Sequence, residues 1–160
     1  MLALYCIGTC LLVLIDQLSK LAVLRYIRPL NTLPLWEGVF HLTYCENRGA
    51  AFGILQNKFG LFYLITAIVV IFITVYIAKK RPQSRVLNIS LTLLVGGALG
   101  NVIDRLFRGF VVDFFDFRLI HFPIFNPADC FVVCGTFLLA VYILFLEGRQ
   151  KSEINKKGNE

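Results

Sequence analysis

The chain has 160 residues, of which 58% are hydrophobic and only 16% are charged. A soluble domain carries about 25% charged residues, and a chain this short would have a large surface to cover with them. The composition excludes a disordered chain, a nucleic-acid-binding domain and most cytosolic enzymes, so it indicates an integral membrane protein. The net charge of +6 is then informative by position, because Lys and Arg set the orientation of membrane proteins.

Four apolar segments are each long enough to cross a bilayer, which takes about 20 residues. They cover residues 3–24, 59–78, 86–105 and 128–146. The first is not typical of a signal peptide, because no Lys or Arg precedes Asp16 and no small-residue cleavage site stands out. We therefore predict a retained helix there, and a single membrane domain over residues 1–160.

The basic residues predict how these helices are oriented. Residues 79–85 hold four cations and the tail, residues 147–160, holds four more. The other two loops, residues 25–58 and 106–127, are longer and more dilute in cations. The positive-inside rule therefore predicts that the short loop, the tail and both termini are cytoplasmic, and that the two longer loops face outside.

The first of these outer loops contains signs of local structure. Residues 38–44 alternate apolar and polar side chains, which predicts a short strand. Residues 48–56 fit a short interfacial helix with Phe52, Ile54 and Leu55 towards lipid.

Cysteine and histidine indicate no chemistry of their own. Four cysteines lie in pairs at i, i+4 spacing inside the spans, where Cys behaves as a small apolar residue. Cys45 alone lies in an outer loop, so it has no evident disulfide partner. If Cys45 acted as a nucleophile it would need a nearby base, and His41 is a possible one. Two histidines without ligand-like spacing predict no metal site.

Aspartates provide the strongest functional signal. Five lie within the spans or at their outer ends, where ionisable groups are costly and by default indicate function. They are Asp16, Asp104, Asp113, Asp116 and Asp129. Asp113 follows the third span and Asp129 opens the fourth, so their carboxylates can meet at one depth. Such a pair shares a proton in a low dielectric, which is what aspartic protease chemistry requires.

Some of these residues also have a purely structural interpretation. Asn126, Pro127 and Asp129 together are typical of a helix start. Asp113 could be a loop residue in water, although its Val and Phe neighbours argue against that. Asn47 and its neighbour Gly49 could be ordinary turn residues.

The remaining polar candidates could simply pair with each other. Asp16 and Lys20 lie at i, i+4 on one helix face. Asp104 and Arg105 could be a charge pair at a helix end. Residues 96–100 contain a Gly-x-x-x-Gly spacing, which lets helices approach closely.

Five motifs taken in order resemble the lipoprotein signal peptidase (signal peptidase II) family. They are residues 16–20 (DQLSK), 47–53 (NRGAAFG), 96–105 (GGALGNVIDR), 109–114 (GFVVDF) and 125–129 (FNPAD). The resemblance implies an all-α integral protein of the bacterial inner membrane, with four transmembrane helices, a small outer β-cradle and a short interfacial helix.

The resemblance also implies an aspartic endopeptidase that cuts signal peptides from diacylglyceryl-modified prolipoproteins, just before the lipidated cysteine. The family's catalytic aspartates fall on Asp113 and Asp129, and the motif register favours Asp113 over Asp116. Supporting or substrate-binding positions are Asp16, Lys20, Asn47, Gly49, Asn101, Asp104, Arg105 and Asn126. The family implies no metal or cofactor, membrane lipids as partners, a monomer, and sensitivity to cyclic peptide antibiotics such as globomycin.

A proton-coupled transporter and a helical scaffold are the alternative functions. Transporters tend to show internal repeats and a site near the midplane, whereas this chain shows no repeat and its acids collect at one face. A scaffold has no need of two acids that converge at one depth. The motif match favours the peptidase over both.

Overall fold

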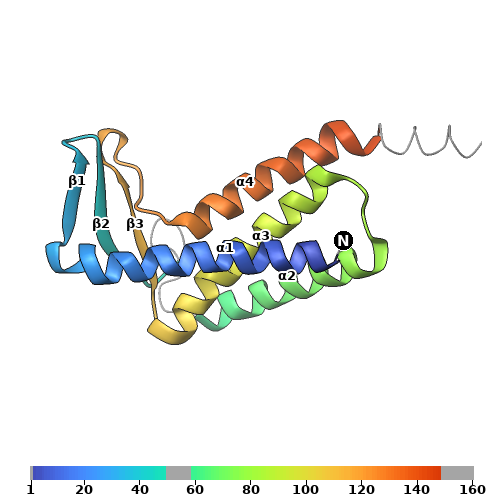
Figure 1. The fold of residues 1–160 in the computed structure, drawn as a ribbon, viewed down its shortest axis with the longest axis horizontal. Helices are drawn as coiled ribbons and strands as arrows, with labels where there is room; N and C mark the ends of the chain where they lie inside the picture. Colours follow the sequence, from blue (N-terminus) through green and yellow to red (C-terminus); the bar gives the residue numbers. More distant parts are fainter. Residues whose placement is uncertain (1, 50–58, 149–160) are drawn as a thin grey trace, which may run out of the picture.

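The structure, a computed structural model, describes residues 2–49 and 59–148. Long helices run side by side, and a small sheet stands beyond one end of them (Figure 1). This arrangement confirms the predicted fold class of membrane helices with a small β-structure. The predicted interfacial helix lies almost wholly outside the described residues, as does most of the tail.

The four long helices are α1 (Leu2–Ala22), α2 (Phe59–Lys80), α3 (Arg85–Arg108) and α4 (Pro127–Val141). π-helical turns extend α1 over Val23–Ile27 and α4 over Tyr142–Leu146, and a 3-10 turn, Arg28–Leu30, follows the first of them. In the described part of the chain, four helical segments are long and apolar enough to cross a membrane. The first ends at Leu30 rather than near residue 24, because the backbone breaks only at Asn31, whose φ is 65°.

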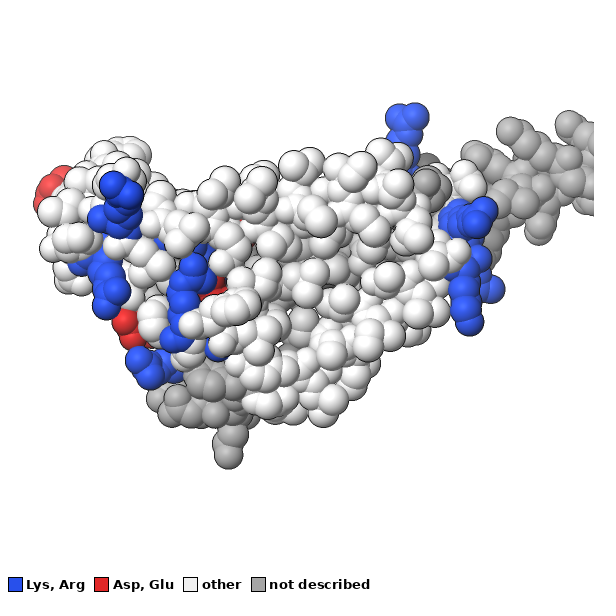
Figure 2. All heavy atoms as spheres, turned by 60° about the horizontal axis from the view of Figure 1, so that its bottom comes forward, with Lys and Arg blue, Asp and Glu red and all other residues white. Residues whose placement is uncertain are grey.

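Most of the helix surface is apolar and uncovered by protein. Leu4, Ile71, Phe72 and Leu144 are each 63–73% exposed. Exposed apolar surface on this scale marks contact with another apolar phase. Figure 2 shows Lys and Arg side chains at the two ends of the molecule and a body almost free of charge between them. This pattern fits a body that lies in the bilayer between two charged faces.

The central helix is α3, which packs against all three other helices. Glycines permit this: a Cβ on Gly96 would lie 2.8 Å from Leu12 of α1, and one on Gly97 would clash with the Ala128 carbonyl of α4. The helix-packing interpretation of residues 96–100 is therefore confirmed. A buried apolar cluster joins α1, α2 and α3, and consists of Tyr5, Ile73, Ile77, Leu87, Leu91 and Val95.

The sheet is antiparallel in the order β1 (Thr32–Trp36), β2 (Phe40–Asn47) and β3 (Val111–Phe117). β2 covers most of the strand predicted over residues 38–44 and runs three residues further. The other two strands were not predicted, because their polar–apolar alternation is weak. In the β2–β3 ladder, Cys45 stands opposite Asp113, beyond an irregularity that follows Leu42.

Backbone contacts of β3 bring the ends of α3 and α4 together. The Phe125 carbonyl accepts hydrogen bonds from the N–H groups of Phe114 (2.9 Å) and Phe115 (2.8 Å). The segment that leads into α4 therefore runs alongside β3. On its other side, the Val112 N–H donates to Asp104 Oδ2 of α3 (3.0 Å).

Candidate active site

Asp113 lies in β3 with only 2% of its surface exposed. Its neighbours Val112 and Phe114 belong to a buried apolar cluster. The Asp113 carboxylate accepts hydrogen bonds from Asn47 Nδ2 (2.9 Å) and Asn126 Nδ2 (2.5 Å). Burial, together with the negative charge of Asp129, raises the pKa of Asp113 to about 7. The interpretation of Asp113 as a loop residue in water is therefore wrong.

Asp129 stands in the first turn of α4. Its N–H donates to Asn126 Oδ1 (3.0 Å), and its own Oδ2 accepts from the Asn126 N–H (3.2 Å). This capping box, with Pro127 in the first turn, confirms the helix-start interpretation. The cap leaves Oδ1 to accept from Asn101 Nδ2 (2.8 Å). Asp129 is thus a capping residue and a member of the polar cluster at the same time.

Asn126 connects the two aspartates. Its side-chain amide donates to Asp113 and its backbone N–H donates to Asp129. Asn126 is fully buried, so its position is fixed by packing as well as by these bonds. The two carboxylates are therefore held on either side of one residue, close enough for the charge of Asp129 to raise the pKa of Asp113.

Asp116 has separate partners in the sheet. Its Oδ2 accepts hydrogen bonds from Thr43 Oγ1 (2.6 Å) and Arg118 Nε (2.9 Å). Burial acts to raise the pKa of Asp116, but these two donors outweigh it and the pKa lies below its usual value. Asp116 therefore links strands β2 and β3 and stands apart from the Asp113–Asp129 pair.

A groove of about 840 Å³ opens beside the two aspartates. Asp113 and Asp129 line it together with Asn47, Asn101 and Arg105. Its other walls are mainly apolar and come from α4 and the segment before it, namely Phe122, Pro123, Ile124, Phe125, Val132 and Val133. A mostly apolar groove with polar groups gathered at one point is the usual form of a ligand site.

Behind the groove, Lys20 of α1 is completely buried. Its ammonium lies 2.9 Å from Asp16 Oδ2 and 3.0 Å from Asp104 Oδ2, and it donates to Asn101 Oδ1 at 3.0 Å. The predicted pairing of Asp16 with Lys20 is confirmed, as part of a larger cluster. Arg108 completes this cluster by pairing with Asp104, so two carboxylates are balanced by two cations.

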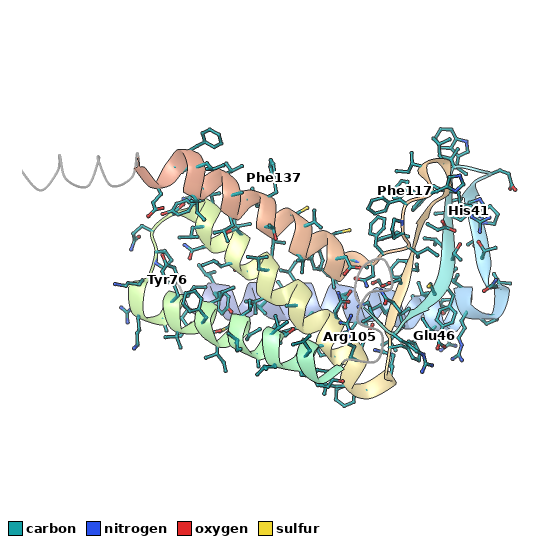
Figure 3. The ribbon with its side chains drawn as sticks, turned by 180° about the vertical axis from the view of Figure 1, so that it is seen from behind. His41, Glu46, Tyr76, Arg105, Phe117 and Phe137 are labelled. Carbon is teal, nitrogen blue, oxygen red and sulfur yellow. The ribbon has the colours of Figure 1, made fainter. Side chains whose placement is uncertain are left out.

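Arg105 joins α3 to the turn after β2, and Figure 3 shows it where α3 approaches the sheet. Its Nη2 donates to the Gly49 carbonyl (2.8 Å). The Gly49 N–H in turn donates to Asn47 Oδ1 (3.0 Å), which confirms the turn interpretation of these two residues. Asp104, for which a helix-end pair with Arg105 was an alternative, forms ion pairs with Lys20 and Arg108.

Two members of the network were not singled out from the sequence. Gln17 Nε2 lies 3.1 Å from a carboxylate oxygen of both Asp16 and Asp104, and its Oε1 accepts from Arg108 (3.1 Å). Arg108 was detectable by its i, i+4 spacing from Asp104. Gln17 gave no such signal, because apart from the adjacent Asp16 its partners lie on another helix. Among the described residues, no three His, Cys, Asp or Glu side chains are arranged to hold a metal ion.

Comparison with known proteins places this geometry in a family. Residues 9–145 match the family described as Signal peptidase (SPase) II. A lipoprotein signal peptidase of Clostridioides difficile is 45% identical over 148 residues, which are 92% of this chain and 99% of that protein. One from Anoxybacillus flavithermus is 44% identical and covers 92% of this chain and 89% of its own. The chain belongs to the signal peptidase II family.

Solved structures agree with this assignment. A bacterial membrane enzyme structure at 2.3 Å resolution superposes with a TM-score of 0.81 at 31% identity, over 89% of this chain and 88% of that one. A second, at 1.9 Å, gives a TM-score of 0.79 at 31% identity, over 90% and 94% of the two chains. This chain is therefore an aspartic-type peptidase and a multi-pass bacterial membrane protein.

The structure brings all ten predicted site residues of this chain into one connected network. They come from α1 (Asp16, Lys20), the end of β2 (Asn47) and the turn after it (Gly49), α3 (Asn101, Asp104, Arg105), β3 (Asp113) and the start of α4 (Asn126, Asp129). Residues far apart in the sequence thus meet at the junction of helices and sheet.

Proposed function

We propose that this chain removes signal peptides from diacylglyceryl-modified prolipoproteins, and that Asp113 and Asp129 activate the water that cuts the peptide bond just before the lipidated cysteine. The observation that carries the proposal is the bridging of the two carboxylates by Asn126 at the wall of an apolar groove. The relatives named lipoprotein signal peptidase support the choice of substrate.

In this mechanism Asp113 holds the proton of the pair. It is buried in a strand, and its pKa is raised to about 7 by burial and by the charge of Asp129. Asp129 sits in the first turn of α4, where a helix end accommodates negative charge. The assignment describes the form of the pair that dominates below about pH 7, the raised pKa of Asp113.

The reaction then follows from these two states. Asp129 takes a proton from water while the water oxygen bonds to the peptide carbonyl carbon. The Asp113 carboxyl group hydrogen-bonds the carbonyl oxygen and stabilises the tetrahedral intermediate. When the C–N bond breaks, the leaving nitrogen receives a proton from the pair.

The surrounding side chains act as positioning residues. The Asn101 oxygen accepts from Lys20 Nζ (3.0 Å) and Asn126 Nδ2 (3.2 Å), so its amide nitrogen must point at Asp129. The ammonium of Lys20 therefore fixes the orientation of Asn101. Asn47 and Asn126 similarly direct N–H groups at Asp113, and the four carboxylate oxygens of the pair accept one hydrogen bond each.

The groove accounts for a lipid-modified substrate. Its walls are apolar along α4, including Val132 and Val133, and its polar groups gather at the end where α4 begins. Acyl chains along α4 would leave the adjoining peptide bond near Asp113 and Asp129. Arg105 lines the same groove and can donate to a peptide or ester carbonyl of the substrate.

The sheet and the aspartates face outside in this proposal. The short connection between α2 and α3 and the helix ends that flank it hold Lys79, Lys80, Arg81 and Arg85, at the opposite end of the helices from the sheet (Figure 1). A cation-rich short loop favours the cytoplasm. The active site then opens at the outer surface of the membrane, where secreted prolipoproteins arrive.

The deciding experiment compares Asp113→Asn, Asp129→Asn and Asp116→Asn in the cleavage of a diacylglyceryl prolipoprotein in lipid. General acid–base catalysis contributes about 10²–10⁴-fold, so we expect each of the first two variants to lose at least about 100-fold of its rate. The Asp116→Asn variant tests for a general effect of removing a carboxylate, and we expect it to retain most activity. Full activity of either Asp113→Asn or Asp129→Asn would contradict the proposed mechanism.

A further inference from the structure

Each of the two aspartates has a cysteine beside it. Cys45 is the ladder partner of Asp113 on β2, and residues directly opposite in a sheet share one face. Cys130 follows Asp129 in the first turns of α4. Both thiols are free, both are partly exposed, and both line the groove.

The other cysteines differ in their position. Cys134 also lines the groove, one helical turn further along α4. Cys6 and Cys10 lie on α1 and are exposed, but they are not among the residues that line the groove. The chain therefore contains a matched control set of accessible thiols away from the aspartates.

Cys45 has no role in the peptidase mechanism. The ring of His41, the base considered for it, lies 3.4 Å from Thr32 Oγ1 and accepts from the Gly38 N–H (3.3 Å) instead. Burial, and then the charge of Asp113, raise the pKa of Cys45. A thiol of this kind is a poor nucleophile at neutral pH and becomes more reactive as the pH rises.

We propose that Cys45 and Cys130 form a covalent modification site for soft electrophiles with an apolar body, such as α,β-unsaturated carbonyl compounds, and that their adducts block the groove. The apolar walls favour binding of such a molecule, and the two thiols line the same groove beside the aspartates. The inhibitory part of the proposal rests on the proposed function, because it requires the substrate to use this groove.

The chemistry is a simple addition. The thiolate sulfur bonds to the β-carbon of the unsaturated carbonyl compound, and the electrons of the C=C bond take up a proton from water at the α-carbon. The proton lost by the thiol returns to the solvent. The step needs no oxidant or reductant, and the adduct remains attached beside Asp113 or Asp129.

The test treats the full chain in lipid nanodiscs with N-ethylmaleimide and locates the adducts by mass spectrometry. Each variant's cleavage activity is expressed relative to its own untreated activity. We expect at least about a tenfold loss in the natural chain and in Cys6→Ser/Cys10→Ser. The triple variant Cys45→Ser/Cys130→Ser/Cys134→Ser is expected to keep most of its own activity after treatment, whereas Cys134→Ser alone is expected to lose as much as the natural chain.

A second measurement does not depend on activity. The rate of adduct formation at Cys45 is expected to rise with pH, and above about pH 7 it is expected to be faster in Asp113→Asn, which lacks the neighbouring negative charge. A pH-independent rate, or one unchanged in this variant, contradicts the assigned environment of Cys45.

Three results would overturn the proposal. They are the absence of adducts at both thiols in the folded enzyme, adducts at either thiol without loss of activity, and a loss in Cys45→Ser/Cys130→Ser/Cys134→Ser equal to that of the natural chain. Failure of the proposed function would give a different result. Untreated Asp113→Asn would then still cleave prolipoprotein, while the same cysteines would be modified.

Discussion

At the residue scale, Asn126 determines how the two aspartates are held. It caps α4 through Asp129 and donates to Asp113 from the same buried position. One residue thus serves helix initiation and the geometry of the carboxylate pair. Its partner Asn101 repeats the arrangement on α3, because its amide accepts from Lys20 and donates to Asp129.

The raised pKa of Asp113 predicts the pH dependence of cleavage. The proposed mechanism needs its proton, so kcat/KM should fall as the pH rises through about 7. A pH profile of prolipoprotein cleavage checks this, and Asp116→Asn serves as the control because its carboxyl lies apart from the pair. An alkaline limb well above pH 8, about one pH unit beyond the raised pKa of Asp113, contradicts the assignment of the proton to Asp113.

The same pKa predicts a change in stability. The folded protein keeps this proton up to about pH 7, whereas an unfolded chain releases it near the usual 3.8. The contribution of Asp113 to stability is therefore complete below about pH 4 and is lost as the pH rises to about 7. Over that interval we expect the free energy of unfolding of the natural chain to fall by on the order of 4 kcal/mol relative to that of Asp113→Asn. Above about pH 7 the difference between the two free energies should stay constant. Thermal unfolding in detergent at several pH values measures this difference.

The buried charge cluster predicts a charge-balance effect. Lys20→Met leaves Asp16 and Asp104 with Arg108 as their only cation in the cluster, and breaking a buried ion pair from one side costs about 3–5 kcal/mol. Asp16→Asn combined with Lys20→Met restores neutrality, so the double variant should recover part of the lost stability. A double variant less stable than Lys20→Met alone, measured by thermal unfolding, contradicts this account.

At the element scale, the packing of α3 depends on its glycines. Gly97→Ala places a methyl group against the Ala128 carbonyl at the start of α4, and overpacking of this kind costs about 1–3 kcal/mol. Gly60→Ala on α2 meets nothing within 4 Å and is the matched control. We expect thermal unfolding to show a marked loss for the first variant and almost none for the second. Equal effects would mean that the close approach of α3 and α4 is unimportant.

The helices and the strands also differ in how well local sequence predicts them. The four spans are long and mainly apolar, so their positions follow largely from hydropathy. β3 contains the run Val111–Phe117, whose apolar residues do not alternate cleanly because both of its faces are largely buried. β1 is short and contains Pro34. These two strands exist mainly through their pairing with β2, which local sequence does not reveal.

At the scale of the whole molecule, the distribution of charge predicts orientation. In a chain whose five native cysteines are replaced by Ser, we expect Trp36→Cys, on the sheet, to react with a membrane-impermeant maleimide in intact cells. Gln83→Cys, in the loop between α2 and α3, should react only after the membrane is permeabilised. Both positions are exposed, so the comparison depends on sidedness alone. The reverse labelling pattern contradicts the proposed topology.

Hydropathy and motifs are local properties of the chain, so they were enough to predict the membrane class, the approximate positions of the spans and the residues that match the family. The sequence also indicated that Asp113 and Asp129 could meet, since both adjoin the same ends of neighbouring spans. Only the tertiary structure decided that Asn126 bridges them, that Lys20 pairs with two aspartates from different helices, and that Asp116 stands apart. The contacts of Asn126 with Asp113, of Thr43 with Asp116 and of Lys20 with Asp104 cross 13 to 84 residues of chain, and only folding brings such groups within hydrogen-bond distance.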